Sequence, residues 1–201
     1  MSLEDYEARR GDRSPEPRGG EASGDGPIFV IQKHDASTLH YDFRLEGDGV
    51  LKSWAVPKGP STDPSEKRLA LPTEDHPIDY ADFEGVIPED EYGAGTVLVW
   101  DRGPYEHLTE ARDGGEPPSL EEAVETGHVV VRLHGEKLTG GYALQRVEDA
   151  EDPEDARWLL VKMSDDAADA RRNPVSTEPL SVASGRDLQE VREDEGGEDD
   201  A

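Results

Sequence analysis

Three polar side chains that could do chemistry stand at every second position of one stretch, at His40, Asp42 and Arg44, and alternate with aromatic or apolar residues. Successive side chains of a β-strand point to opposite faces, so an imidazole, a carboxylate and a guanidinium would share one face. Imidazole and carboxylate groups bind divalent transition metals, and a guanidinium forms paired hydrogen bonds with a phosphate. His34, on the preceding apolar run, could supply a third metal ligand across a short turn.

The same spacing is also typical of a row of ion pairs on the exposed face of an antiparallel sheet. What favours a metal–phosphate site is the set of polar residues that follows: Lys58 in a proline-flanked turn, Arg68 at the start of a strand, His76 before a proline, and Tyr80 in the same loop. Each of these residues alone fits an ordinary structural role. Together they add phosphate-binding cations and a titratable imidazole to the proposed metal ligands.

The elements that must position these residues are mostly strands. Apolar runs bounded by Gly and Pro predict about eight of them, at residues 29–33, 41–45, 50–56, 68–73, 96–101, 128–133, 138–146 and 158–163. One helix is expected between Ser119, which forms a capping box with Glu122, and Gly127. This order predicts a mainly β fold, an antiparallel β-barrel of about eight strands with short flanking helices.

Composition divides the chain into three parts. Residues 1–26 are rich in Gly, Pro, Arg and Glu and predict a mobile N-terminal arm, with a short helical piece in residues 3–10. Its arginines, Arg9, Arg10, Arg13 and Arg18, suit either a solvated tail or an arm that folds over a bound polyanion. Residues 27–164 carry the barrel pattern. Residues 165–201 are acidic and poor in aromatics, so a largely disordered C-terminal tail is expected.

The 201-residue chain carries 48 acidic and 21 basic residues, a formal net charge of −27, and its hydrophobic content is 33%. Such a charge fits either disorder or the acidic surface of a halophilic protein; the ordered motifs favour the halophile. The absence of cysteine excludes disulfides, zinc–thiolate sites and a cysteine nucleophile. No apolar run reaches membrane-spanning length and the N-terminus has no hydrophobic signal core, so we expect a soluble, cytoplasmic protein.

Four segments together closely resemble the 3′-phosphoesterase module of bacterial and archaeal DNA ligase D: QKHDASTLHYDFRLE at 32–46, GVLKSWAVPKGPS at 49–61, KRLALPTEDHPIDYADFEGVIP at 67–88 and YGAGTVLVWDRG at 92–103. The resemblance covers roughly residues 27–164. It implies a barrel fold, a manganese cofactor and activity on DNA 3′ ends in nonhomologous end joining. Such modules remove a 3′-terminal ribonucleoside and then hydrolyse the remaining 3′-phosphate to leave a 3′-OH.

The resemblance also implies roles for individual residues of this chain. The implied manganese ligands are His34, His40 and Asp42. The implied phosphate-binding and catalytic residues are Arg44 and His76, with Tyr80 as a further active-site contact. The implied supporting residues are Lys58, Arg68 and Glu74.

An N-terminal motif of the family, Arg-Asp-Phe…Thr-x-Glu-Pro, has a partial counterpart in this chain. Arg9 and Glu16 match it and are expected to contact substrate, whereas Arg10 and Gly11 replace its Asp and Phe. This departure leaves open how much the arm contributes, especially to cleavage of the diester.

The expected partners are DNA or RNA-tipped DNA 3′ ends, with no membrane. No polymerase or ligase motif accompanies the module, so we expect a stand-alone esterase, or a partner of separately encoded ligase, polymerase or Ku-type repair proteins. His76 could stabilise the transition state or protonate the leaving oxygen, and direct attack by water is expected. A non-catalytic, end-binding scaffold for repair proteins is the alternative function, and a cupin-like small-molecule metalloenzyme is a third hypothesis.

Overall fold

The computed structural model describes residues 2–11, 14–20, 24–111 and 114–196. The strands are β1 (Ile28–Asp35), β2 (Leu39–Gly47), β3 (Val50–Val56), β4 (Lys67–His76), β5 (Gly85–Ile87), β6 (Gly95–His107), β7 (His128–His134), β8 (Thr139–Glu148) and β9 (Arg157–Lys162). The helices are α1 (Leu3–Ala8), α2 (Leu120–Thr126), α3 (Pro174–Thr177) and α4 (Leu188–Glu195), with 3₁₀ turns η1 (Ile78–Asp82) and η2 (Pro153–Asp155). No helix among these described residues is long and apolar enough to cross a membrane.

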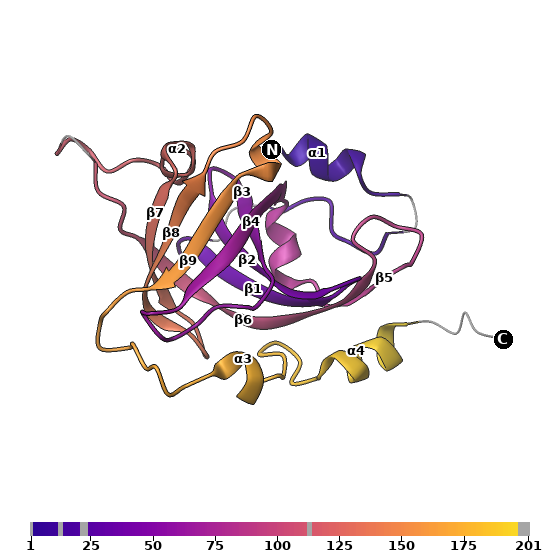
Figure 1. The fold of residues 1–201 in the computed structure, drawn as a ribbon. Helices are drawn as coiled ribbons and strands as arrows, with labels where there is room; N and C mark the ends of the chain where they lie inside the picture. The colour runs from indigo at the N-terminus through magenta and orange to yellow at the C-terminus, as the bar shows by residue number, and fades with distance from the viewer. Residues whose placement is uncertain (1, 12–13, 21–23, 112–113, 197–201) are drawn as a thin grey trace.

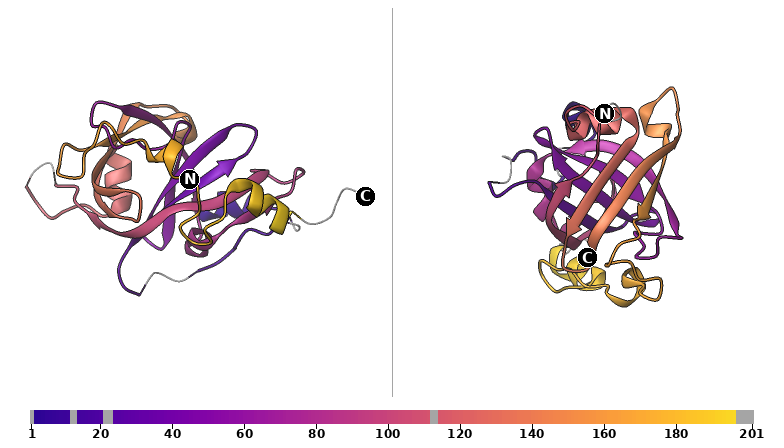
Figure 2. Two further views of the ribbon diagram at one scale, coloured as in Figure 1. Left: turned by 90° about the horizontal axis from the view of Figure 1, so that it is seen from below. Right: turned by 90° about the vertical axis from the view of Figure 1, so that its left-hand side faces the viewer.

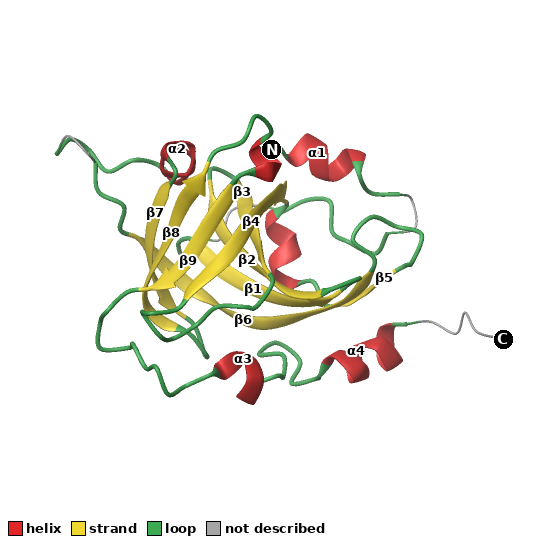
Figure 3. Ribbon diagram, viewed as in Figure 1, coloured by secondary structure: helices red, strands yellow, loops and turns green. Residues whose placement is uncertain are grey.

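Eight of the strands close into an antiparallel barrel, which confirms the predicted fold. Their order is β1-β2-β3-β4-β9-β8-β7-β6, and β6 pairs back with β1 to complete the ring. The short strand β5 pairs with β6 outside this ring. Figure 1 and the right-hand view of Figure 2 show the strands curving around one interior, and Figure 3 shows the short helices at its periphery.

Alternation of side chains gives the wall of the barrel two apolar faces. Inside, residues from all eight strands form the main core; Phe43 and Leu45 of β2 pack there with the tryptophans Trp54, Trp100 and Trp158. Outside, a second buried cluster covers part of β1, β3 and β6 with residues of α1, η1 and β5. Because neighbouring residues of β2 face opposite ways, the polar side chains between its core residues lie on this covered outer face.

The described residues 2–11 and 14–20 of the N-terminal arm pack against the outer face of the barrel. Tyr6 of α1 is fully buried in the outer apolar cluster, and its hydroxyl donates to the carbonyl of Pro17 at 2.6 Å. The physical reason is that one aromatic ring supplies enough apolar burial to hold a short, capped helix in place. Arg13 lies outside the described residues.

Residues 174–196, within the segment expected to be a largely disordered tail, form what we call the C-terminal strap. It contains α3 and α4 and runs beneath the barrel in Figure 1 and in the right-hand view of Figure 2. The backbone carbonyl of Glu178 accepts from the Trp100 indole at 2.8 Å and from Lys137 Nζ at 2.9 Å, and Val191 is fully buried. Acidic composition does not indicate these contacts, because one is made by a backbone carbonyl and the other by a single apolar side chain. Residues 197–201 lie outside the described part.

Candidate active site

The hairpin of β1 and β2 brings the three predicted metal ligands together. His34 and His40 face each other directly in its register, and Gln32 faces Asp42, so the four side chains share the outer face of the wall. His34 Nδ1 lies 3.6 Å from Asp42 Oδ2, and His40 Nε2 lies 3.6 Å from Asp42 Oδ1. One donor atom from each of these three residues falls within 4.8 Å of the other two.

The chemistry of this donor set fits a divalent transition metal. His40 Nδ1 lies 2.9 Å from the carbonyl of Thr38, to which it can donate, and this arrangement presents the Nε2 lone pair toward Asp42. His34 Nε2 is buried without a hydrogen-bond partner in the described part of the chain. Two imidazoles and a carboxylate at such separations leave room for a shared cation, and these ligand types suit transition metals.

Asp42 stays ionised although it is buried. Burial by itself raises the pKa of a carboxyl group, but the Arg44 guanidinium and the two imidazoles outweigh it and hold the pKa of Asp42 well below its ordinary value. Arg44 Nη2 lies 3.3 Å from Asp42 Oδ2. The site therefore presents a permanent negative charge to a metal ion and a permanent positive charge beside it.

Arg44 is held in place by a buried residue that the sequence reasoning missed. Gln32, which is fully buried, accepts from Arg44 Nε at 2.8 Å and donates to the carbonyls of Tyr80 and Phe83 at 2.8 and 3.1 Å. It thereby joins β2 to the η1 segment that carries Tyr80. A sequence signal was available, since Gln32 is a polar residue in an apolar run, two positions before His34 and hence on the same face.

His76 lies next to Arg44 in an aromatic enclosure. Its Nδ1 is 2.8 Å from the carbonyl of Glu74, two residues earlier, and 3.1 Å from Arg44 Nη1. The ring lies 4.8 Å from Tyr6 and 4.6 Å from Tyr80, centroid to centroid. Burial, together with the Arg44 charge, lowers the pKa of His76 well below its ordinary value. A neutral ring whose Nδ1 is engaged by the protein leaves Nε2 to contact a substrate.

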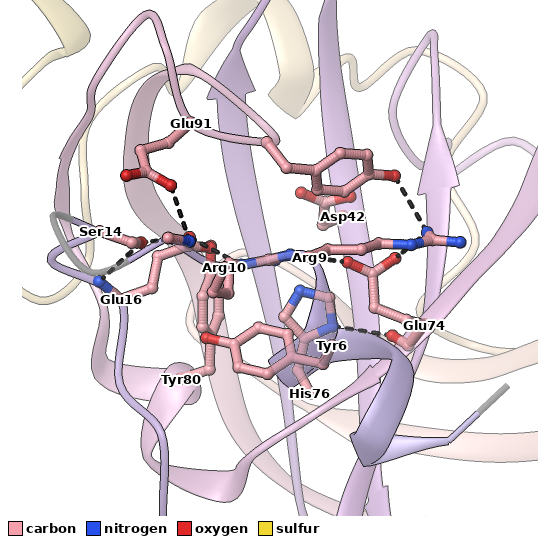
Figure 4. A network of polar contacts seen from close by, with 12 residues as sticks. Tyr6, Arg9, Arg10, Ser14, Glu16, Asp42, Glu74, His76, Tyr80 and Glu91 are labelled. Atoms are coloured by element: carbon pink, nitrogen blue, oxygen red, sulfur yellow. Dashed lines mark hydrogen bonds and ion pairs between the residues drawn. The ribbon is translucent and has the colours of Figure 1, made fainter.

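The N-terminal arm completes the site through a network of buried charges (Figure 4). Glu16 accepts from the Tyr80 hydroxyl at 2.9 Å and pairs with Arg10 Nε at 2.7 Å. Glu74 pairs with Arg10 Nη1 at 3.1 Å and with Arg9 Nη1 at 3.2 Å. Arg10, which departs from the family motif, is thus the more buried arginine of the pair, with 4% of its side chain exposed against 30% for Arg9.

A cleft of about 260 Å³ opens at this point and is shared by barrel and arm. Eight candidate residues line it, namely His34, His40, Asp42, Arg44, Glu74, His76, Tyr80 and Glu16. Arg10 and Tyr92, which the sequence reasoning did not propose as site residues, also line it, whereas Arg9 lies just behind and contacts Glu74 and the Tyr92 hydroxyl.

The structure does not bring the remaining two candidates to the cleft. Arg68 lies at the opposite end of β4 from His76 and is not among the residues that line the cleft. Lys58 is exposed in the turn after β3 and does not line the cleft either. The resemblance implied a supporting role for both residues, and their positive charge fitted a phosphate site.

The chain is similar to known proteins over most of its length. Residues 32–146, more than half of the chain, match the family model described as the DNA ligase D 3′-phosphoesterase domain. The multifunctional non-homologous end joining protein LigD of Pseudomonas aeruginosa is 47% identical over 192 residues, which is 92% of this chain and 22% of that protein. LigD of Mycolicibacterium smegmatis is 44% identical over 160 residues, 78% of this chain and 20% of the relative. The chain therefore spans about a fifth of the length of these curated relatives.

Proposed function

The chain belongs to the DNA ligase D 3′-phosphoesterase domain family, and from this premise and the geometry of the cleft we propose that it hydrolyses phosphate esters at DNA 3′ ends with the help of manganese. The proposed substrates are a 3′-terminal ribonucleoside, removed by cleaving its diester bond, and a 3′-phosphate, removed as the monoester. Cleavage of the diester leaves a 3′-phosphate, and hydrolysis of that monoester leaves a 3′-OH that can be extended or sealed.

His34, His40 and Asp42 would hold the metal, which when bound polarises a phosphoryl oxygen as a Lewis acid. Arg44 binds a second phosphate oxygen, and Gln32 fixes its guanidinium in advance, so little side-chain entropy is lost on binding. His76 would be neutral, with Nδ1 accepting from Arg44 Nη1, so that its Nε2–H can donate a hydrogen bond to a phosphate oxygen or to the leaving oxygen of the ester. Water is the proposed nucleophile.

The arm supports the diester step in this proposal. A diester substrate carries a further nucleoside beyond the scissile phosphate, so it extends past the metal and Arg44 toward the groups that the arm brings to the cleft. Arg10 and Glu16 line the cleft there, and Tyr80 donates to Glu16. We propose that these groups orient the leaving nucleoside, whereas a terminal phosphate relies on the metal ligands, Arg44 and His76.

In the cell, the proposed role is the repair of DNA breaks by non-homologous end joining, the process named for the LigD relatives. The proposed partners are DNA or RNA-tipped DNA ends and ligase, polymerase or Ku-type repair activities. The acidic surface, at a net charge of −27, fits a protein that works in concentrated salt.

The single observation that carries the proposal is that His34, His40 and Asp42 meet in one cleft with Arg44 and His76. The test compares Asp42→Asn with a control variant, His128→Ala. His128 lies on β7, where its Nδ1 is 3.0 Å from Gln145 Oε1, and it does not line the cleft. Manganese affinity is measured by electron paramagnetic resonance, and 3′-phosphate and 3′-ribonucleoside release are measured on labelled primer–templates.

Asp42→Asn is expected to weaken metal binding and to lower both activities by about 100-fold or more, since several kcal/mol of charge stabilisation are lost, while circular dichroism stays unchanged. His128→Ala is expected to match the parent protein. Near-normal turnover by Asp42→Asn at saturating manganese would contradict the ligand assignment. A parent protein that binds ends and metal but releases neither product would point to the end-binding scaffold instead.

A further inference from the structure

A second hollow, of about 450 Å³, opens at one end of the barrel. The start of β3, the end of β4, the end of β8 and the start of β9 all meet at this end, with α2 and the β8–β9 connection around them (Figure 1). We call this hollow the mouth pocket. Among its lining residues are Trp54 and Trp158, whose rings meet edge to face at 5.6 Å inside the barrel. Its volume lies in the range of small-molecule sites, which often occupy barrel mouths.

The mouth pocket and the candidate active site lie on either side of one strand. Glu74 lines the active-site cleft, the next residue, Asp75, lines the mouth pocket, and Thr73 lines both. The β3–β4 pairing shifts register between Leu51 and Ser53, so β4 is irregular here and its neighbouring side chains reach different hollows. The backbone of β4 therefore separates the two hollows.

Polar groups of the mouth pocket are of the kind that recognise a neutral, flat ring with donors and acceptors. Trp54 Nε1 and Thr73 Oγ1 are buried without a hydrogen-bond partner in the described part of the chain. Buried donors of this kind cost free energy unless a ligand or water satisfies them. Asp75, which pairs with Lys52 at 2.9 Å, and Glu121 supply acceptors at the rim.

The charge of the lining argues against a phosphate in this pocket. Two cations, Lys52 and Arg146, face four carboxylates, which are Asp75, Glu121, Glu125 and Asp149. These carboxylates would repel an anion, whereas the exocyclic amino groups of a base can donate hydrogen bonds to them. The active-site cleft differs in that Arg44 and Arg10 present guanidinium groups there beside Glu16, Asp42 and Glu74, and a guanidinium suits a phosphate.

We propose that the mouth pocket binds the base of the nucleotide that carries the scissile 3′-phosphate. This inference rests on the proposed function. The sugar of one nucleotide separates its base from its phosphate, and this separation allows the two groups to lie on either side of the rim formed by Thr73, Glu74 and Asp75. The base would satisfy the unpaired polar atoms Trp54 Nε1 and Thr73 Oγ1 at the wall of the pocket, where Trp54 and Trp158 are 1% and 2% exposed.

The first test measures binding without any phosphate chemistry. The full chain, labelled with ¹⁵N, is titrated with adenosine, and the three indole N–H signals are assigned by single Trp→Phe variants. The signals of Trp54 and Trp158 are expected to move in a saturable way, and that of Trp100, buried against Tyr41 and Lys137, is expected to stay. No movement, or equal movement of all three signals, overturns the proposal.

The second test asks whether the base contributes to turnover. Two 3′-phosphate primers are compared, one ending in an ordinary nucleotide and one ending in an abasic tetrahydrofuran residue. Removing the base is expected to raise KM about tenfold and to change kcat little, because its hydrogen bonds in the mouth pocket are lost. Equal KM values for the two primers overturn the proposal, whereas loss of turnover on both would contradict the proposed function and leave the adenosine titration as the test of the pocket.

A pocket-filling variant links the two tests. Val124→Trp fills the mouth pocket from α2, and Val147→Trp adds the same ring at an exposed position of β8 that does not line it. Val124→Trp is expected to give both primers the same high KM and to abolish the adenosine shifts. Val147→Trp is expected to keep the KM difference between the two primers and the adenosine shifts of the parent protein. If Val124→Trp does not fold, Glu121→Leu, at a half-exposed rim carboxylate, replaces it, with a smaller rise in KM expected for the ordinary primer alone. An unchanged KM ratio in a folded pocket variant contradicts the proposal.

Discussion

At the scale of single residues, the buried amide of Gln32 decides how Arg44 meets a phosphate. It is the acceptor for Arg44 Nε and the donor to two carbonyls of the η1 segment. Because Gln32 contacts neither the substrate position nor the metal ligands, it is a positioning residue. The Arg44 guanidinium would otherwise be free to turn toward Asp42 alone.

Gln32→Leu is expected to reduce the free energy of unfolding by about 1–3 kcal/mol, because it removes the acceptor of Arg44 Nε and the side-chain donor to the Tyr80 and Phe83 carbonyls. It should also raise KM for a 3′-phosphate end more than it lowers manganese affinity. Denaturant unfolding, steady-state kinetics and metal titration check this expectation. Gln145→Leu, on the exposed face of β8, is the matched control, and an equal loss of stability in both variants would contradict the role of Gln32.

His76 predicts a pH dependence of stability. Burial and Arg44 lower the folded-state pKa of His76 well below 6.5, the value that applies to the unfolded chain. Below pH 6.5 the unfolded state therefore binds a proton that the folded state does not, and stability falls as the pH falls. Above that pH the ring is neutral in both states and contributes no slope.

Unfolding free energies of the metal-free protein, measured between pH 7.5 and 5, check this sign for the parent and for His76→Gln. The parent is expected to lose more stability over the interval than the variant, whose curve lacks the histidine contribution. Parallel curves would mean that His76 ionises as readily in the folded protein as in the unfolded chain.

At the scale of elements, the C-terminal strap stabilises the barrel from outside. Lys137 Nζ donates to the carbonyls of Glu178 and Leu180, and the Trp100 indole also donates to Glu178. Arg192 of α4 pairs at 2.6 Å with Asp35, the neighbour of the proposed metal ligand His34. The strap therefore supports both the core and the hairpin that carries the site.

Truncation after Thr177 is expected to lower the melting temperature by several degrees. It deprives Trp100 and Lys137 of their acceptors, at about 1–3 kcal/mol for each buried donor left unpaired, and each kcal/mol shifts the midpoint by roughly 2–4 °C. Truncation after Gly196 removes only residues beyond α4 and serves as the control. Calorimetric midpoints that agree within a degree for the two truncations would show that the strap contributes nothing.

At the scale of the whole molecule, the net charge of −27 sets the response to salt. The acidic side chains of the protein repel one another and repel DNA over the screening length. This length is roughly 10 Å at 0.1 M and about 3 Å at 1 M ionic strength. Salt weakens general DNA affinity as well, because counterion release no longer favours binding. Short contacts in a partly buried cleft are screened less, so recognition is expected to depend on Arg44, His76 and the metal.

Stability is expected to rise between 0.1 and 2 M potassium chloride, and phosphatase activity is expected to persist or rise over the same range. Circular dichroism melts and phosphate release across the series check this. A protein that is most stable and most active near 0.05 M, with steady loss above it, would contradict adaptation to concentrated salt while leaving the proposed esterase chemistry unaffected.

The sequence alone determined the barrel and the hairpin at the centre of the site. Strand periodicity is local, so the alternation at His40, Asp42 and Arg44 predicted a shared face, and one short turn placed His34 opposite His40. The same alternation distinguishes the residues of β2 that face the core from those that face the site. These features required no knowledge of what packs against the strand.

Only the tertiary structure decided which distant groups complete the site. His76 reaches Arg44 because β4 pairs with β3, and Tyr6 and Arg10 reach the site because α1 packs on the outer face, whereas Arg68 does not line the cleft. The arm and the strap looked disordered because their composition is polar, yet a few buried groups and backbone carbonyls hold them. Composition averages over a segment, whereas docking depends on where individual atoms meet a surface that the rest of the chain has built.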